Sequence, residues 1–401
     1  MKILFVLNNF NIGGPQKSLL SLLHNFPEDS EIDLLVLNGQ TPLKKYLPKN
    51  VNLRTGSTEV NLLMMEKRGV LSNIVKTFLK NPKLSYRAIS TIIKTILKRK
   101  SFTTVKQEFW KQNKDSLKQE CSDKYDLAVG ASGGHSMMYI VDFVRSKYKV
   151  GWVRTEYQNL RRNLQIDEYY FNELNRVLSV SNKCTEKFSE LFPEQAFKCI
   201  TFYNALPFKM YSNIKNKFHY FEKKDEYILV TISRLDKDKG FDLLIGAARI
   251  LKEKNVDFTW FIYGEGPMKN YIAKEIKKYK LDKYILLKGF VFNTGEILRN
   301  SDALVHPSKF EGKSNTLDEA KYYQVPIVST NFPTVQEQLH QGVTGIITDL
   351  NAESLANGIY KLLNNQELRS NLSKNLEKEK QSVEKRDVYQ EFITAIRGAS
   401  K

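Results

Sequence analysis

The feature that most constrains this chain is a repeated alternation of short apolar runs with helix-like segments. Residues 2–7 form an almost continuous apolar run, which is typical of a strand buried on both faces, and a helix with Pro15 in its first turn follows after a loop. Strands that alternate with helices indicate a parallel sheet, so this half of the chain predicts a doubly wound α/β domain. Further strands are expected at 32–37, 127–130, 149–153 and 176–180.

A second series of the same kind begins at residue 227. Between the two series, residues 208–225 are polar, rich in Lys and Asn and without periodicity, so we place the domain link there. We predict two Rossmann-like domains, residues 1–206 and 207–385, and a charged helix over 367–401 whose last part, 386–401, packs back toward the first domain. The strands of the second series are expected at 227–232, 258–263, 284–288, 303–306, 326–329 and 345–348, and its helices at 241–253, 268–279, 316–323 and 352–363.

The formal charge of +18 is concentrated in one segment. Residues 67–118 hold 14 Lys and Arg against 2 acidic residues, which leaves the rest of the chain only mildly basic. The surrounding segment, 62–118, predicts a basic helical insertion in the first domain. It has apolar residues at helical spacing (Val70, Ile74, Phe78, Ile89, Ile92, Ile93, Ile96, Leu97) beside basic ones (Lys76, Lys80, Lys94, Lys98, Arg99).

Three interpretations fit such basic amphipathic helices. An anionic membrane surface is one, and a solvated face whose apolar side packs on the domain is an equally good interpretation. Nucleic acid or another phosphate-rich polymer ranks third, and we expect no nucleic-acid partner. The oligomeric state stays open.

Cysteine usage and the first residues bear on location. Cys121, Cys184 and Cys199 form no Cys-x-x-Cys pair and are odd in number, which disfavours a disulfide framework or a zinc site and indicates reduced thiols in the cytosol. The apolar residues 3–7 are too few for a signal-peptide core, and no run reaches the ~18 residues of a membrane span. We expect a cytoplasmic protein, peripheral on the inner face of the plasma membrane.

Two glutamates separated by seven residues, Glu311 and Glu319, form the strongest candidate site. A short buried strand ends just upstream, and residues 314–316 are all good N-caps for the helix that follows. Glu311 is therefore expected in a strand-to-helix loop and Glu319 early in a helix. Free backbone N–H groups and the positive end of a helix between two carboxylates suit a ligand with phosphate and hydroxyl groups, such as a nucleotide sugar.

Arg234 and Lys239 follow the strand at 227–232 and precede a helix. At the carboxyl end of parallel strands both side chains can reach one anion, the first as a bidentate fork and the second as a point charge. Alone, such a loop is more often an ordinary basic loop, but the paired glutamates favour a site. Asp236 and Asp238 form an Asp-x-Asp pattern, yet lysines flank them and hard cations need several oxygen ligands, so no metal is expected.

Other short motifs are weaker. Gly264 belongs to a tight turn after a strand, and Gly13 and Gly14 follow the first strand without the Gly-x-Gly-x-x-Gly spacing, which disfavours nicotinamide cofactors. Among the histidines, His135 and His306 are the site candidates, because each stands at the end of a strand. A Ser/His/Asp hydrolase is not supported, since no Gly-x-Ser-x-Gly elbow is present.

Taken together, the chain resembles retaining glycosyltransferase family 4, also called glycosyl transferases group 1. The family has the GT-B fold, in which two Rossmann-like domains face each other across a cleft. The resemblance spans nearly the whole chain, and its specific part is the Glu-x7-Glu element together with the Arg/Lys pair. It is carried by Gly13-Gly14, residues 152–157, Asn204, Ser233-Arg234, Lys239-Gly240, residues 264–267 and the segment from Glu311 to Glu319.

The resemblance implies a role for each matching residue. Arg234 and Lys239 would hold the donor diphosphate, Glu311 would face the transferred sugar, and these three are the expected catalytic residues. No cofactor or metal is implied, because the nucleoside-diphosphate sugar is a co-substrate. Further donor contacts are expected from Gly13 and Gly14 across the cleft, Gly264, the backbone at Ser314 and Asn315, and Glu319 at the ribose hydroxyls.

One position departs from the family. Many relatives carry His in a Trp-x-His-x-Asp-like segment near the sugar, and here Arg154 stands at that place. Either Arg154 contacts the donor sugar or an acidic acceptor, or His135 supplies the imidazole. An ion pair between Arg154 and Glu156 is an equally good explanation.

The resemblance implies a retaining, metal-independent enzyme that transfers a hexose or N-acetylhexosamine. A sugar would move from a nucleoside diphosphate, with UDP favoured, to a lipid-linked or polymeric acceptor during bacterial capsule, surface-polysaccharide or wall-glycan synthesis. Alternatives are another GT-B enzyme, such as a sugar-nucleotide epimerase or a phosphorylase, or a non-catalytic glycan-binding protein with this fold.

Overall fold

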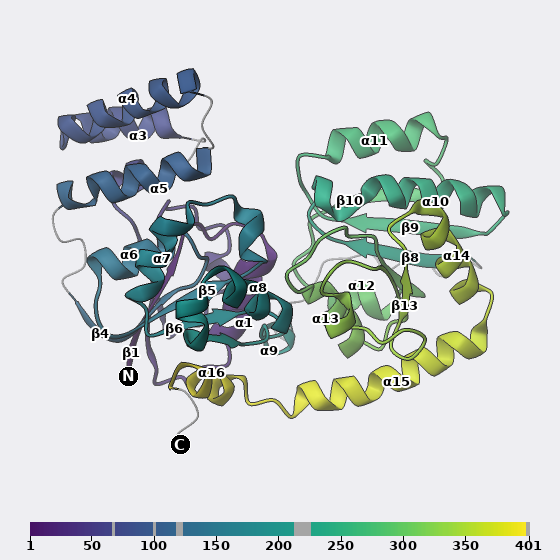
Figure 1. Ribbon diagram of the computed structural model, residues 1–401. Coiled ribbons are helices and arrows are strands. Elements are labelled where there is room, and N and C mark those ends of the chain that lie inside the picture. Colours follow the sequence, from purple (N-terminus) through teal and green to yellow (C-terminus); the bar gives the residue numbers. More distant parts are fainter. Residues whose placement is uncertain (66–68, 99–101, 118–122, 212–225, 398–401) are drawn as a thin grey trace. The chain divides into compact units, whose positions relative to one another are not determined.

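The computed structural model describes residues 1–65, 69–98, 102–117, 123–211 and 226–397, without the side chains of 96–98. The chain divides into two compact units, the first Met1–Ala205 with Val388–Lys401 and the second Leu206–Asp387 (Figure 1). Arg99 and most of the expected link, 212–225, lie outside the described residues.

The first unit is built on a seven-stranded, entirely parallel sheet with the order β3-β2-β1-β4-β5-β6-β7. The five strands expected here are present, and β3 and β7 at the two edges are additional. β3 alternates between half-buried and exposed residues and therefore has no continuous apolar run. The strands are β1 (Lys2–Leu7), β2 (Glu31–Val36), β3 (Val51–Thr55), β4 (Lys124–Gly130), β5 (Arg145–Val153), β6 (Arg176–Ser179) and β7 (Cys199–Thr201).

Helices cover this sheet, and four of them form the insertion between β3 and β4. Its α3, α4 and α5 lie together beside the rest of the unit (Figure 1). None of the helices in the described part of the chain combines the length and the apolar character of a membrane span. The helices are α1 (Gly14–Leu23), α2 (Thr58–Leu63), α3 (Val70–Phe78), α4 (Pro82–Lys98), α5 (Phe102–Asn113), α6 (His135–Phe143), α7 (Leu164–Asn172), α8 (Asn182–Leu191) and α16 (Val388–Arg397).

The second unit has a six-stranded, entirely parallel sheet with the order β10-β9-β8-β11-β12-β13. Its strands are β8 (Tyr227–Ile232), β9 (Phe258–Tyr263), β10 (Ile285–Gly289), β11 (Ala303–His306), β12 (Ile327–Thr330) and β13 (Ile346–Thr348). Its helices are α9 (Phe208–Tyr211), α10 (Phe241–Glu253), α11 (Lys269–Lys278), α12 (Gly295–Arg299), α13 (Asn315–Tyr322), α14 (Ala352–Leu363) and α15 (Gln366–Glu384). These strands match the expected ones, so the chain has the α/β fold with two parallel sheets that was predicted.

The end of the chain, expected to be helical over 367–401, contains two helices. α15 and α16 are separate helices, because the apolar residues of each are buried in a different unit. Leu372 and Leu376 of α15 are buried in the second unit. Phe392 of α16 packs in the first unit against the rings of Phe5, Phe26, Trp152 and Phe202.

Short 3-10 turns complete both units. They are η1 (Lys44–Tyr46), η2 (Lys114–Ser116), η3 (Tyr157–Leu160), η4 (Pro193–Lys198), η5 (Lys237–Lys239) and η6 (Val335–Glu337).

Candidate active site

Glu311 and Glu319 lie on either side of the start of α13. Glu311 belongs to the loop after β11, and Glu319 to α13 itself. The Ser314 hydroxyl caps the helix by accepting a hydrogen bond from the Leu317 amide (3.4 Å). Because β11 and β8 are parallel neighbours, the loops that follow them leave the same edge of the sheet.

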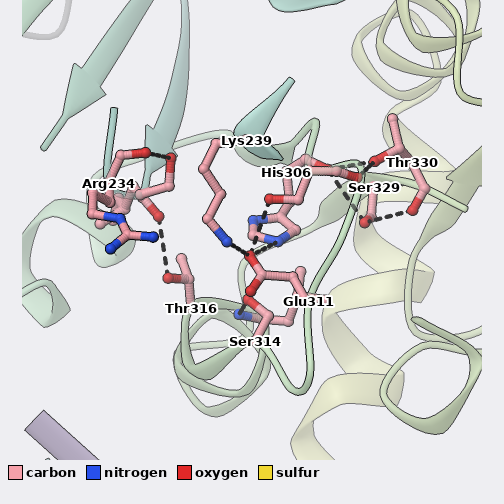
Figure 2. A network of polar contacts seen from close by, with 12 residues as sticks. Arg234, Lys239, His306, Glu311, Ser314, Thr316, Ser329 and Thr330 are labelled. Carbon is pink, nitrogen blue, oxygen red and sulfur yellow. Dashed lines mark hydrogen bonds and ion pairs between the residues drawn. The ribbon is translucent and has the colours of Figure 1, made fainter. Parts of the chain in front are cut away.

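The Glu311 carboxylate is the centre of a polar cluster (Figure 2). Lys239 Nζ lies 2.6 Å from Glu311 Oε1, and both side chains are only 15% exposed. The Ser308 hydroxyl donates to the same oxygen (3.0 Å), and His306 Nε2 lies 3.4 Å from it. Burial raises the pKa of Glu311, but His306 and the Lys239 charge outweigh it and lower the pKa to about 2. At neutral pH this carboxylate is an anion that accepts hydrogen bonds and cannot donate a proton.

Two contacts between loops hold Lys239 in place. Gly240 has φ +64°, and a Cβ at this position would lie 1.8 Å from the Pro307 carbonyl oxygen. The Lys309 amide donates to the Asp238 carbonyl (2.8 Å). The loop after β8 is thus docked on the loop after β11, at a distance that no side chain at position 240 permits.

Arg234 lies in the same loop as Lys239 but has a different partner. Its Nη2 lies 3.1 Å from Asp236 Oδ2, and its side chain is 66% exposed. The structure therefore brings Lys239 and Glu311 together and does not bring Arg234 into that cluster. Since exposed ion pairs contribute little, the Arg234 guanidinium is the more easily redirected of the two cations. No group of three His, Cys, Asp or Glu within the described residues is placed to hold a metal ion.

Glu319 is 1% exposed and faces hydroxyl groups. Thr294, the N-cap of α12, donates its hydroxyl to Glu319 Oε2, and the Tyr211 hydroxyl lies 3.5 Å from the same oxygen. Burial, and then the charge of Glu319, raise the pKa of Tyr211 well above its usual range, so Tyr211 stays protonated. In this structure the carboxylate is satisfied by two protein hydroxyls, the same kind of donor that a ribose presents.

The amide of Ser314 is already used within the protein. It donates to Gln338 Oε1 (2.8 Å), and Gln338 Nε2 donates to the Ser314 carbonyl (2.8 Å) and to Asp318 Oδ1 (2.9 Å). Gln338 therefore fixes the start of α13. The expected donor contacts of the Ser314 and Asn315 backbone stay predictions.

Gly264 is required by the same loop system. Its φ is +153°, and a Cβ here would lie 1.8 Å from the Ser233 carbonyl oxygen. The end of β9 can therefore lie directly against the loop that carries Arg234. A contact of Gly264 with a donor stays a prediction.

Several residues of this site were not found from the sequence. Ser308 lies three residues before Glu311, and a search for hydroxyl and imidazole groups just after β11 would have paired it with His306. Thr294, Tyr211 and Gln338 carry no signal in the sequence, because their partners are distant along the chain.

In the first unit, Gly13 and Gly14 lie at the carboxyl end of β1. Gly13 is the N-cap of α1 with an extended backbone, and Pro15 stands in the first turn as expected. A Cβ at Gly13 would lie 2.7 Å from the side-chain oxygen of Gln16, the flexible end of a side chain. Their expected role in closing over a donor stays a prediction.

Arg154 directly follows β5 and is held by neutral groups. Its Nε donates to the Ala131 carbonyl (3.1 Å), and its Nη1 donates to Asn204 Oδ1 (3.0 Å) and to the Ser18 hydroxyl (3.3 Å). The guanidinium lies 3.4 Å from the centroid of the Trp152 ring. Asn204, a residue of the family resemblance, thus positions Arg154.

The charge of Arg154 has no carboxylate partner among the described residues. Burial lowers the pKa of Arg154 to about 9, and its Nη2 has no hydrogen-bond partner within the part of the chain that the structure describes. The ion pair with Glu156 does not form: Glu156 instead accepts a hydrogen bond from Gln158 (3.2 Å). Arg154 is thus a half-buried residue whose Nη2 is buried and has no partner among the described residues.

His135 is the first residue of α6 and is 7% exposed. Burial, and then the charges of Arg162 and Lys106, lower the pKa of His135 to about 3, so the ring is neutral. The ring lies 5.2 Å from that of Trp110, and Arg162 itself pairs with Asp167 at 2.6 Å. The imidazole is therefore packed in the unit and does not titrate near neutral pH.

Comparison with known proteins finds a family match in the second unit. Residues 212–379 match the family model described as Glycosyl transferases group 1. We call this matched segment, which lies within the second unit, the group 1 domain. The group 1 domain contains Lys239, Glu311 and Glu319, and the resemblance drawn from the sequence is thereby confirmed for this part of the chain.

Two curated relatives are similar over part of their length. The poly(ribitol-phosphate) alpha-N-acetylglucosaminyltransferase of Staphylococcus aureus is 30% identical over 35% of this chain and 29% of that protein. The N-acetylgalactosamine-N,N'-diacetylbacillosaminyl-diphospho-undecaprenol 4-alpha-N-acetylgalactosaminyltransferase of Campylobacter jejuni is 31% identical over 43% of this chain and 46% of that protein. The chain spans less than half the length of these relatives.

Solved structures match the whole chain. A mutant of S. aureus TarM in complex with fondaparinux, alpha-GlcNAc-glycerol and UDP has a TM-score of 0.67 at 17% identity, covering 99% of this chain and 100% of that one. Anabaena HepE in complex with UDP and glucose has a TM-score of 0.69 at 16% identity, with 99% and 100% covered. At these identities the match shows the fold, and the predicted GT-B fold class is confirmed.

Proposed function

We propose that this chain is a glycosyltransferase that moves a sugar from a nucleoside diphosphate to a lipid-linked or polymeric acceptor in bacterial surface-polysaccharide or wall-glycan synthesis. The observation that carries the proposal is the Lys239–Glu311 pair at the carboxyl edge of the second sheet, inside a group 1 domain. UDP in the TarM and HepE structures, and the names of the curated relatives, favour a UDP-sugar carrying a hexose or an N-acetylhexosamine.

The cations of the site suit the leaving group. Breaking the bond between the anomeric carbon and phosphate places negative charge on the nucleoside diphosphate. Lys239 is fixed close to one carboxylate, and a diphosphate with more negative charge competes for it, while exposed Arg234 can turn toward the same group. A preorganised donor at such a position typically contributes ~3 kcal/mol to transition-state stabilisation. In this scheme no metal and no cofactor are needed, and activity in excess EDTA tests that.

The two glutamates take different parts of the donor. Glu311 stays ionised, so it accepts sugar hydroxyls and stabilises positive charge at the anomeric carbon, whereas protonation of the leaving group is not its role. Glu319, surrounded by hydroxyls, binds the ribose by exchanging a protein hydroxyl for a ligand hydroxyl. Transfer with retention follows from the family resemblance, and NMR of the product's anomeric proton tests it.

Arg154 in the first unit contacts the sugar or an acidic acceptor. A buried guanidinium without a carboxylate is unfavourable, and an anionic or hydroxyl-rich ligand that reaches the guanidinium relieves this cost. His135 is the weaker candidate, because it is packed beside Trp110. Replacing Arg154 with His restores the residue that many relatives carry, and the KM for acceptor is the readout.

Donor binding and turnover test the proposal together. A thermal-shift screen of UDP-, GDP- and ADP-sugars identifies the donor, since a ligand that binds the native state raises the unfolding temperature. Lys239→Ala is expected to lose donor hydrolysis and transfer. Lys309→Ala is the matched control, because Lys309 lies in the neighbouring loop and pairs with Asp242 (2.7 Å) outside the cluster.

The products decide between enzyme classes. Transfer requires an acceptor, whereas an epimerase releases nucleoside diphosphate or interconverts the sugar without one. If no donor raises the unfolding temperature and Lys239→Ala equals Lys309→Ala in every assay, the catalytic assignment is wrong.

We also propose that the protein works at the cytoplasmic side of the plasma membrane, where lipid-linked acceptors are available. Its oligomeric state is not assigned.

A further inference from the structure

The helices α3 and α4 carry apolar side chains on their exposed surface. On α3 and its C-cap, Leu71, Val75, Phe78 and Leu79 are 73, 71, 55 and 91% exposed. Their spacing of four, three and one residues places them on one side of the helix. A stripe of four exposed large apolar residues on a short helix costs solvation free energy unless something covers it.

The neighbouring helix repeats the arrangement. On α4, Tyr86, Ile89 and Ile93 are 72, 41 and 52% exposed and follow one another at three and four residues. We call these seven residues of α3 and α4 the exposed apolar face.

A different set of residues packs the two helices onto the unit. Both helices therefore have two apolar sides, one used for packing within the unit and one that is not. The helical periodicity in the sequence does not distinguish these two apolar sides. Of the residues that it groups together, Phe78, Ile89 and Ile93 are exposed. Val70, Ile74 and Ile92 pack inward. The buried set is Ile74 and Thr77 of α3 with Leu84, Ser85 and Ala88 of α4.

The charge of this segment is of one sign. Residues 69–98 contain six Lys and Arg and no Asp or Glu. Exposed basic residues accompany the apolar face on both helices and in the turn between them: Lys76, Lys80, Lys83, Arg87 and Lys94. Large exposed apolar side chains beside cations, without any counter-charge on the same helices, match the interfacial region of an anionic bilayer.

We propose that α3 and α4 dock the first unit on an anionic lipid bilayer. The exposed apolar face enters the boundary between headgroups and acyl chains, and the Lys and Arg side chains contact lipid phosphates. This inference does not rest on the transfer reaction, because none of its residues belongs to the candidate active site.

Other occupants fit less well. A second copy of the chain would bring two such segments together with twelve like charges and no acidic residue in either. Nucleic acid would satisfy the charge and leave exposed aliphatic side chains such as Leu79 and Val75 without a partner. A bilayer meets both the charge and the apolar surface.

Vesicle flotation of the full chain tests the proposal. We expect it to float with vesicles of phosphatidylcholine containing phosphatidylglycerol and to remain unbound with phosphatidylcholine alone. The triple variant Leu71→Asn, Val75→Asn, Leu79→Asn should lower the partition coefficient at least tenfold. The quadruple variant Lys76→Gln, Lys80→Gln, Lys83→Gln, Lys94→Gln should lower it about fivefold for each lysine.

Matched controls change exposed residues elsewhere. They are the apolar triple Phe197→Asn, Val343→Asn, Leu350→Asn and the basic quadruple Lys274→Gln, Lys277→Gln, Lys283→Gln, Lys361→Gln, all at exposed positions. Both should float like the unaltered chain. UDP-dependent thermal shift, measured on every variant, reports the donor site separately and should not change.

Three results would overturn the inference. The first is equal flotation of the α3–α4 variants and their controls. The second is binding that ignores the phosphatidylglycerol content. The third is absence of flotation together with a dimer that the Leu71/Val75/Leu79 variant converts to monomer in sedimentation velocity, which would assign the face to self-association. Because the altered side chains are exposed, unchanged circular dichroism is expected, and the charge variant provides a second test should the apolar variant misfold.

Discussion

The two units place charged side chains at the ends of their parallel strands, but they balance those charges differently. In the group 1 domain, Lys239 is paired with Glu311, and Glu319 is surrounded by hydroxyls. In the first unit, Arg154 has only neutral acceptors among the described residues, and His135 is kept neutral by burial. A ligand must therefore displace the existing partners of Lys239 and Glu319 in the group 1 domain. In the first unit it can instead add an acceptor for the Arg154 guanidinium.

The largest expected effect is on turnover, at Lys239. Lys239→Ala removes the fixed cation of the leaving-group site, so kcat should fall about 100- to 1000-fold. The same change leaves the Glu311 anion without its lysine, and the free energy of unfolding should fall by about 2 kcal/mol after allowance for partial exposure. Steady-state kinetics with the donor found by the thermal-shift screen and urea denaturation measure the two effects.

A second substitution separates the two roles of Lys239. In the double variant Lys239→Ala, Glu311→Gln the unpaired charge is gone, so the unfolding free energy should recover while kcat stays low. Recovery of turnover in the double variant would contradict the assignment of Lys239 to the leaving group.

The next effect concerns the docking of the two loops at Gly240. Gly240→Ala adds a Cβ 1.8 Å from the Pro307 carbonyl oxygen at a φ of +64°, so one of the two loops must move. We expect the free energy of unfolding to fall by ~3 kcal/mol and donor binding to be lost. Gly342→Ala is the control, because its φ is +72° and no described residue lies within 4 Å of the added Cβ. Gly342→Ala should lower the free energy of unfolding by about 1 kcal/mol, which is the cost of placing alanine at a positive φ without any steric contact. Equal losses in the two variants would show that the loop contact is unimportant.

These two sites show what a sequence can and cannot provide. The loop position of Glu311 and the helical position of Glu319 follow from local signals, namely an apolar strand and a run of N-cap residues. The partner of Lys239 does not, because Glu311 is 72 residues away and only the order of the strands brings the two loops to one edge. For the same reason the sequence grouped Lys239 with its near neighbour Arg234, which pairs with Asp236.

The fold has the same limit. Strands buried on both faces are continuous apolar runs and were predicted, whereas the half-exposed edge strand β3 was not. Along α3, periodicity identifies residues that share a side, such as Leu71 and Val75, but it cannot say which of two apolar sides packs on the unit. That choice depends on tertiary contacts, as does the separation of α15 from α16.

The two units should lose stability over different ranges of acidic pH. Folding lowers the pKa of His135 from 6.5 to about 3, so its stabilising contribution is complete above pH 6.5 and is lost as the pH falls toward 3. The pKa of Glu311 is lowered from 4.5 to about 2, so its contribution is lost only between those values. From pH 6.5 to 5 the first unit should lose about 2 kcal/mol through His135, and His135→Gln should abolish this slope.

Tryptophan fluorescence can follow the units one at a time. The chain has 3 Trp, of which Trp110 and Trp152 lie in the first unit and Trp260 in the second. In Trp260→Phe the signal reports the first unit, and its urea midpoint should fall between pH 6.5 and 5. A midpoint that is constant over this range in the chain with His135 would contradict the neutral, buried imidazole.

The smallest effect is expected at Arg154, and it tests the other half of the comparison. Arg154→Met removes a cation that has no carboxylate partner among the described residues. The hydrogen bonds to Ala131, Asn204 and Ser18 and the contact with the Trp152 ring are lost, and the unfolding free energy should change by about 1 kcal/mol. If the Arg154 guanidinium binds an anion, inorganic phosphate should raise the unfolding temperature of the unaltered chain more than that of Arg154→Met at the same ionic strength. A larger loss for Arg154→Met than for Lys239→Met, with no difference in phosphate response, would mean that Arg154 is a structural residue. In that case Arg154 would not be a binding position for an anion, and the first unit would not differ from the group 1 domain in this respect.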